Sequence, residues 1–141
     1  MTTKQNILAI DESKAIRFLL QTVLGQKHQV ITASDGCSAL YWLSKRNLPD
    51  VIIVDPQLPD MQNWELLEHL TSSGLYGHIP IIVLSALDNK ETRQKCEELG
   101  IVEYFQQPFN PVELEKAIDR LTGAKAANYE NKKPEAVLKA V

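Results

Sequence analysis

Three acidic residues stand at the ends of two apolar runs, a pattern that suits chemistry on a phosphoryl group. Asp55 ends the run Val51–Val54. Asp11 and Glu12 follow a second run, over residues 7–10. Branched aliphatic residues without polar alternation predict strands that are buried on both faces of a parallel sheet. The three carboxylates would then meet at the carboxyl edge of that sheet, where open α/β sheets bind their ligands.

These carboxylates would repel one another unless a cation joined them. All-oxygen ligation suits Mg²⁺, which takes one or two carboxylates and keeps several waters. With the ion present, Asp55 is a candidate nucleophile toward phosphorus. A further strand-like run ends in Ser85 and Ala86. The Ser85 hydroxyl and the Ala86 amide can each donate a hydrogen bond to an oxygen of the transferred group.

The elements that would position these residues alternate between strand-like and helical patterns. This alternation predicts an α/β fold, doubly wound around a parallel sheet. We expect a flavodoxin-like (βα)5 arrangement with strand order 2-1-3-4-5. The predicted strands cover residues 7–10, 28–33, 51–54, 79–84 and 101–105. The helices between and after them have apolar stripes within residues 16–24, 39–43, 66–70, 92–99 and 114–121.

Helix caps and buried faces follow from the same patterns. The predicted N-caps are Asp35, Asp88 and Asn110. Leu19 is assigned to the inward stripe of the first helix, whereas the tryptophans Trp42 and Trp64 fall off the inward positions of their helices. The fourth helix has a thin apolar stripe of Thr92, Cys96 and Leu99, so it should be among the less firmly held elements.

Length and composition indicate one ordinary globular domain. The chain has 141 residues, of which 44% are hydrophobic and 23% charged, with a formal net charge of -3. That balance argues against nucleic-acid binding by the chain as a whole. We expect a domain over residues 1–123 and a flexible tail over 124–141. The start lacks a signal-peptide pattern and no apolar run could span a bilayer, so we expect a cytoplasmic protein that does not bind membranes. The isolated Cys37 and Cys96 are expected to be buried or half-buried thiols.

The chain resembles the receiver domain of two-component response regulators over residues 5–122. The resemblance rests on several short motifs in a fixed order, each weak alone and specific together. They are Asp11-Glu12, Asp55, Leu58-Pro59-Asp60-Met61, Ser85-Ala86, Tyr104 and Pro108-Phe109.

The resemblance implies roles for the residues at the carboxyl edge. Asp55 would be the phosphoacceptor. Asp11 and Asp55 would bind Mg²⁺ together with the Gln57 carbonyl, and Glu12 would act directly or through water. Ser85 would then move toward the phosphoryl group.

By moving, Ser85 would vacate the space into which the Tyr104 ring turns. The face formed by the fourth helix, fifth strand and fifth helix would then change its affinity for a partner.

The sequence departs from the family pattern at three positions. Gln107 stands where receivers carry a lysine that pairs with the phosphoryl oxygens; an amide can donate one hydrogen bond there but brings no charge. Pro56 follows the acceptor and removes a backbone donor. Asn63 replaces the usual glycine, a change that we expect to be mild because asparagine tolerates left-handed geometry. The family also implies a cis Gln107–Pro108 peptide.

We therefore expect a stand-alone receiver rather than an enzyme, since no output domain is recognisable after it. It would accept a phosphoryl group on Asp55 from a histidine kinase or phosphotransfer protein and signal by binding another protein. Gln107 and Pro56 support an alternative, an interaction module with the receiver fold that does not depend on phosphorylation. A small phosphohydrolase is disfavoured, because Gln57 stands where a second carboxylate would serve as general acid.

Overall fold

The computed structural model describes residues 4–123; the tail expected over residues 124–141 lies outside this range. Five parallel strands form one sheet in the order β2-β1-β3-β4-β5. Their bounds are β1 Asn6–Ile10, β2 Gln29–Ala33, β3 Val51–Val54, β4 Ile81–Ser85 and β5 Glu103–Gln106. The predicted flavodoxin-like order is confirmed.

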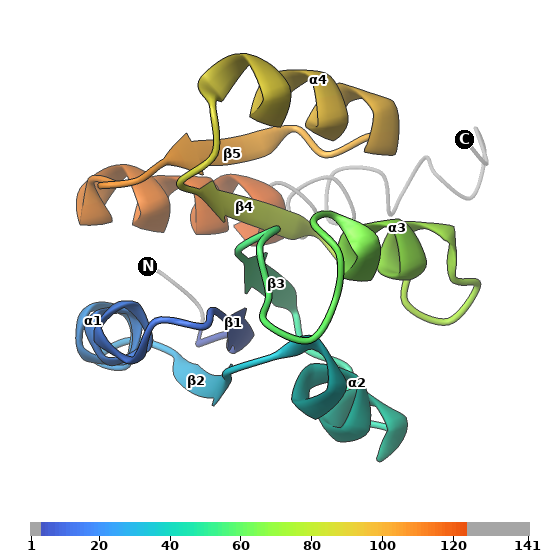
Figure 1. Ribbon diagram of the computed structural model, residues 1–141. Helices are drawn as coiled ribbons and strands as arrows, with labels where there is room; N and C mark the ends of the chain where they lie inside the picture. The colour runs from blue at the N-terminus through green and yellow to red at the C-terminus, as the bar shows by residue number, and fades with distance from the viewer. Residues whose placement is uncertain (1–3, 124–141) are drawn as a thin grey trace, which may run out of the picture.

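Helices cover both faces of the sheet (Figure 1). Their bounds are α1 Lys14–Leu24, α2 Gly36–Ser44, α3 Glu65–Ser72 and α4 Asn89–Leu99, followed by a last helix over residues 111–123. Helix α1 and the last helix pack on one face, and α2, α3 and α4 pack on the other. Within residues 4–123, no helix has the length and apolar character needed to cross a bilayer.

Alternation along the central strands divides the core into two layers. In β3, Val51 and Ile53 pack on the side of α1 and the last helix, whereas Ile52 and Val54 pack on the other side. All four are at most 1% exposed. Complete burial of one such side chain contributes roughly 1.5–3 kcal/mol. A strand buried on both faces is therefore held rigidly, and it fixes the position of Asp55 directly after it.

The helix ends follow the predicted capping chemistry. Asp35 accepts from the Ser38 N–H at 2.7 Å, and Asp88 accepts from the Glu91 N–H at 3.2 Å. Asn110 accepts from the Val112 N–H at 2.8 Å. Helix α4 ends at Gly100, whose φ of 77° lies in the left-handed region that glycine adopts without strain.

Several predictions of exposure were wrong. Leu19 is 38% exposed, because the buried arc of α1 centres on Leu20 and Leu24. Cys37 is exposed, although Cys96 is buried as expected. Trp64 is only 3% exposed. It precedes α3 rather than lying on the helix surface, and its φ of 71° turns the chain so that the indole enters the core.

Two strand boundaries and one backbone assignment also differ from the expectation. β4 begins at Ile81 and β5 at Glu103, two residues later than predicted in each case. Ile79 and Ile101 are buried without joining the sheet, so their apolar character misplaced the boundaries. The left-handed residue in the loop after β3 is Trp64 rather than Asn63. The Gln107–Pro108 peptide is cis, as expected.

Candidate functional site

Three backbone hydrogen bonds place polar residues at the carboxyl edge of the sheet. Each bond continues the pairing of two neighbouring strands past their ends. The bonds join Asp11 N–H to Ala33 O (3.0 Å), Asp55 N–H to Ile10 O (3.0 Å) and Gln107 N–H to Ser85 O (2.8 Å). Asp11, Asp55 and Gln107 are therefore positioned by the sheet itself rather than by freely moving loops.

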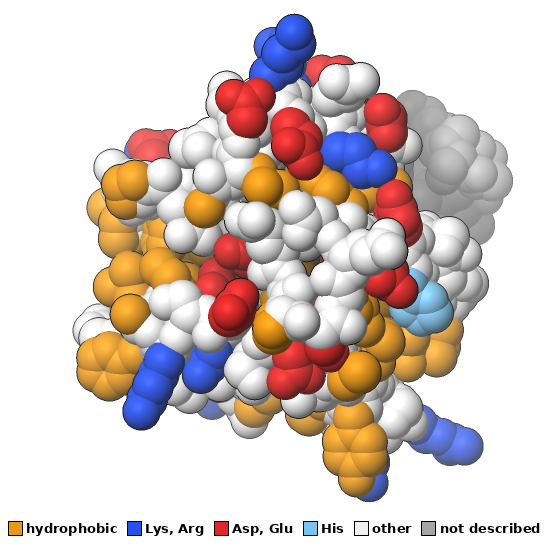
Figure 2. Space-filling view, in the orientation of Figure 1, with side chains coloured by type: hydrophobic (Ala, Val, Ile, Leu, Met, Phe, Trp, Pro, Cys, Tyr) orange, Lys and Arg blue, Asp and Glu red, His pale blue; other side chains and the backbone are white. Residues whose placement is uncertain are grey.

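A cleft of about 490 Å³ opens at this edge. It is lined by Asp11, Glu12, Ser13, Asp55, Gln57 and Gln107. Figure 2 shows acidic side chains gathered near the middle of this face, over the ends of β1 and β3. The structure thus brings together five of the residues that the sequence singled out.

Asp55 is held at the floor of the cleft and is 8% exposed. Its Oδ1 accepts from the Gln57 N–H at 2.8 Å, and its Oδ2 accepts from the Gln107 side-chain amide at 3.3 Å. Burial raises the pKa of Asp55 from its ordinary 3.8 to about 6, and the negative charges of Asp11 and Glu12 act in the same direction. The ionised carboxylate is therefore destabilised in the absence of a cation.

Asp11 carries an unpaired oxygen. Its Oδ1 accepts from the Ser13 N–H at 2.8 Å, but its buried Oδ2 has no hydrogen-bond partner. Burial also raises the pKa of Asp11. The Arg17 guanidinium holds the backbone of the acidic pair, because Nη1 donates to the carbonyl oxygens of Asp11 and Glu12 at 2.8 and 2.9 Å. The carboxylate is thus fixed in place, with one buried oxygen that lacks a hydrogen-bond partner.

The donor set fits Mg²⁺ better than a metal that requires a closed cage. In the described part of the chain, no three His, Cys, Asp or Glu side chains group closely enough to hold an ion by themselves. Mg²⁺ requires only one or two carboxylates, because waters complete its shell. The unpaired Asp11 Oδ2 and the buried Asp55 meet that need. Gln57 also lines the cleft, and the exposed Glu12 is suited to act through water.

Ser85 lies outside the lining of the cleft. Its side chain is fully buried, and its Oγ accepts from the Leu87 N–H at 2.9 Å and from the Thr92 hydroxyl at 3.0 Å. Ala86, the next residue, is exposed. In this structure the Ser85 hydroxyl is therefore directed toward α4, and its role at a phosphoryl group stays a prediction.

Tyr104 is half-buried in β5. Its ring packs against the core layer that includes Val83 and Cys96. In the sheet, Tyr104 lies opposite Val83 of β4. The structure shows one position of the ring, so the assignment of Tyr104 as a switch stays a prediction.

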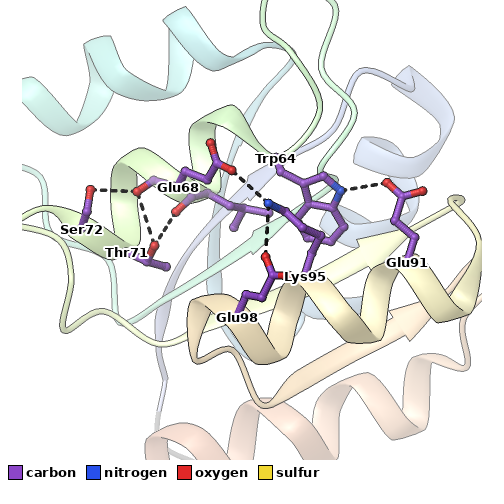
Figure 3. Close-up of polar contacts among 8 residues, drawn as sticks. Trp64, Glu68, Thr71, Ser72, Glu91, Lys95 and Glu98 are labelled. Carbon is purple, nitrogen blue, oxygen red and sulfur yellow. Dashed lines mark hydrogen bonds and ion pairs between the residues drawn. The ribbon is translucent and has the colours of Figure 1, made fainter.

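Polar contacts join helix α4 to α3 and to Trp64 at the start of α3, as Figure 3 shows in close-up. The Trp64 indole N–H donates to Glu91 Oε2 at 3.2 Å. Lys95 Nζ lies 3.0 Å from Glu68 Oε2 of α3 and, within α4, 3.6 Å from Glu98 Oε1. Only Thr92 and Cys96 of α4 are buried. The prediction of a thin apolar stripe is confirmed, and these polar contacts supplement it.

Sequence reasoning missed two contacts that shape this region. Arg17 fixes the backbone of Asp11 and Glu12. Its position one turn into α1 could have indicated this contact only if the start of α1, close after Asp11, had been known. Thr92 was assigned to the inward stripe of its helix but not to Ser85. The pairing of two hydroxyls seven residues apart depends on how α4 packs against β4, which periodicity does not specify.

Comparison with known proteins gives a consistent result. Residues 7–119 match the family described as the response regulator receiver domain. A probable transcriptional regulator, ycf27 of Guillardia theta, is 35% identical over 119 residues, covering 84% of this chain and 45% of that protein. The chain spans less than half the length of this regulator and of the ycf27 regulators of Porphyridium aerugineum and Galdieria sulphuraria, to which it is also similar.

Solved structures show the same fold. The chemotaxis response regulator CheY4 of Vibrio cholerae has a TM-score of 0.74 at 31% identity, covering 84% of this chain and 99% of that one. The receiver domain of the sensor histidine kinase PA1611 from Pseudomonas aeruginosa PAO1 has a TM-score of 0.75 at 24% identity, covering 86% and 99%. That structure has a magnesium ion coordinated in its active site cleft; at this identity the likeness supports the fold alone.

Proposed function

The chain belongs to the response regulator receiver family, and from this premise we propose that Asp55 accepts a phosphoryl group in two-component signalling. The observation that carries the proposal is the pairing of a buried Asp55, whose pKa burial raises to about 6, with the unpaired Oδ2 of Asp11 in one cleft. Neither carboxylate is well stabilised as the structure stands. A bound cation would stabilise both ionised carboxylates, and a phosphoryl group would bond to Asp55.

The proposed metal site uses Asp11, Asp55 and the Gln57 carbonyl, with Glu12 acting through water. Bound there, Mg²⁺ would neutralise charge on the phosphoryl oxygens. Arg17 keeps the Asp11 backbone in position, and the Gln57 N–H holds Asp55 Oδ1. The other carboxylate oxygen of Asp55, Oδ2, accepts from the Gln107 side chain, which also lines the cleft.

The transfer itself would be a displacement at phosphorus. An Asp55 carboxylate oxygen forms the new O–P bond while the P–N bond of a phosphohistidine donor breaks, and the bonding electron pair leaves with the histidine nitrogen. Asp55 must be ionised for this attack. Gln107 would exchange its hydrogen bond to Asp55 for one to a phosphoryl oxygen, and the Ala86 amide and Ser85 hydroxyl would donate to others.

The proposed output is a change in protein binding. Ser85 would leave α4 as it approaches the phosphoryl group, and Tyr104 would turn inward. The outer face of α4, β5 and the last helix carries mixed charge, including an Arg120 guanidinium that donates to both oxygens of Glu103 at 2.9 Å. We propose a histidine kinase or phosphotransfer protein as donor and a protein target for this face.

The test is the intact mass of the protein after incubation with Mg²⁺ and acetyl phosphate. We expect one phosphoryl group on the wild type and none on Asp55→Asn. The control Asp50→Asn, at an exposed aspartate outside the cleft, should still be labelled. Labelling of Asp55→Asn to the wild-type level, or no adduct on a folded wild type, would contradict the proposal.

Gln107 supports a second candidate, a receiver-fold interaction module that does not use phosphorylation. Its neutral amide donates a long hydrogen bond to Asp55 Oδ2, and an amide attracts a phosphoryl group less strongly than an ammonium does. For this module, binding to a partner would be the same for wild type and Asp55→Ala, with or without acetyl phosphate. A requirement for phosphorylation would exclude it.

A further inference from the structure

Two buried hydroxyls connect the end of β4 to the first half of α4. Thr92 Oγ1 donates to Ser85 Oγ at 3.0 Å, and the two side chains are 1% and 0% exposed. The Leu87 N–H donates to the same Ser85 oxygen at 2.9 Å. Ser85 is thus held from two sides, and both bonds direct its oxygen toward α4 rather than toward the cleft.

We propose that Thr92 is a positioning residue that holds Ser85 in its resting place and so sets how readily the domain captures a phosphoryl group. This inference rests on the proposed function, because it concerns the movement of Ser85 toward a phosphorylated Asp55. It adds a residue of α4 to the machinery, at a position that contacts neither the metal site nor the acceptor.

The cost of releasing Ser85 arises from burial. When Ser85 turns toward the cleft, the Thr92 hydroxyl loses its partner inside the protein, where an unpaired polar group is unfavourable. The Thr92 N–H is already bonded to Asp88 O at 2.9 Å. The hydroxyl would have to turn to a backbone carbonyl of its own helix, which threonine can reach. A net hydrogen bond of this kind changes an equilibrium roughly five-fold.

The same turn of α4 carries a natural reporter of this movement. Glu91, the neighbour of Thr92, accepts from the Trp64 indole (Figure 3). Release of Ser85 frees Thr92 and lets the first turn of α4 shift, which would change the surroundings of a tryptophan that is 3% exposed. In a Trp42→Phe background, Trp64 is the remaining tryptophan, so its fluorescence would follow α4.

The experiment compares Thr92→Val, which keeps the shape of the side chain and removes the hydroxyl, with Thr92→Ser, which keeps the hydroxyl. The rate of adduct formation is measured by intact mass with Mg²⁺ and acetyl phosphate. We expect Thr92→Val to react roughly five-fold faster than wild type and Thr92→Ser to stay close to wild type. In a Ser85→Ala background, Thr92→Val should have no further effect.

Trp64 fluorescence with Mg²⁺ and beryllofluoride, a phosphoryl analogue, gives a second readout. Half of the change should occur at a lower beryllofluoride concentration in Thr92→Val, again roughly five-fold. Equal rates and equal midpoints in wild type and Thr92→Val, with Asp55 labelled in both, would overturn the role of Thr92 alone. An effect of Thr92→Val that persists at full size in Ser85→Ala would also overturn it. No adduct on any variant would overturn the proposed function and this inference with it.

Discussion

The Gln107 side chain reaches across the end of β4 to Asp55. Its Nε2 donates to Asp55 Oδ2 at 3.3 Å and to the Leu84 backbone oxygen at 3.4 Å. Three strand ends are thus linked by one uncharged amide. Two long hydrogen bonds shared by one nitrogen hold the group loosely, so the amide can be displaced by a ligand that binds Asp55.

Replacing Gln107 with lysine should speed phosphoryl uptake. Hydrogen bonds from charged groups contribute roughly 1.5–3 kcal/mol, compared with about 0.5–1.5 kcal/mol for neutral ones. The difference predicts an increase of roughly five- to ten-fold in the rate of Asp55 labelling by acetyl phosphate. The matched control is Gln62→Lys, which adds the same charge at an exposed position outside the cleft lining. An equal gain in both variants would indicate general electrostatic attraction rather than a contact with the phosphoryl group.

Without Mg²⁺, Asp55 should make the protein less stable as the pH rises. Its pKa is about 6 in the folded protein and 3.8 ordinarily, so the folded state binds more protons between these values. The free energy of unfolding therefore falls as the pH increases from about 4 to 6. Asp55→Asn should weaken this dependence and unfold at higher urea concentration than wild type at pH 7. A residual slope is expected because burial also raises the pKa of Asp11.

The measurement is urea unfolding in the presence of a chelator across this pH range. Glu97→Gln, which changes an exposed carboxylate on α4, is the control and should follow wild type. Parallel curves for wild type and Asp55→Asn would show that Asp55 does not carry the raised pKa.

Mg²⁺ should stabilise the wild type through Asp11 and Asp55. Binding at a concentration one hundred times Kd adds about 2.7 kcal/mol to the free energy of unfolding. Asp11→Asn should lose most of this gain, because it replaces the carboxylate that carries the unpaired oxygen. Glu97→Gln, an exposed change on α4, should keep it. Thermal unfolding with MgCl₂, compared with NaCl at equal ionic strength, measures the effect; equal gains from both salts would argue against a specific site.

Trp64 should contribute more to stability than Trp42. Trp64 is nearly completely buried and its indole N–H is bonded to Glu91, whereas Trp42 is half-buried. Trp64→Phe should lower the free energy of unfolding by about 1–3 kcal/mol through lost volume and the lost hydrogen bond. Trp42→Phe should lower it by less. Urea unfolding of the two variants tests the ranking, and a larger loss for Trp42→Phe would contradict it.

Much of the fold follows from local sequence pattern, because the strands at its centre are buried on both faces. The run Val51–Val54 leaves few alternatives to an interior parallel strand. The same pattern predicts the cleft, since parallel strands bring Asp11 and Asp55 to one edge whatever the side chains around them do. Strand limits were less predictable, because Ile79 and Ile101 are buried outside the sheet.

Contacts between elements were the part that sequence could not supply. Burial of Trp64 depends on a left-handed backbone that is rare for a large residue. The Ser85–Thr92 bond depends on the distance between α4 and β4, and the unpaired oxygen of Asp11 depends on which side of the carboxylate the Ser13 N–H occupies. Each is a consequence of tertiary packing, which hydrophobic periodicity does not specify.

The residues that hold α4 against α3 differ from those that form the cleft, so how firmly α4 is held and the chemistry at Asp55 could change independently. Glu68 and Glu91 are exposed and Lys95 is half-exposed, and none of them lines the cleft. Substitutions at these positions would alter how firmly α4 is held without disturbing the acceptor, whereas substitutions in β3 would disturb a tightly packed core. Under the proposed function, the sensitivity of the response and the chemistry at Asp55 would therefore depend on different residues, so related chains could differ in the first while keeping the second.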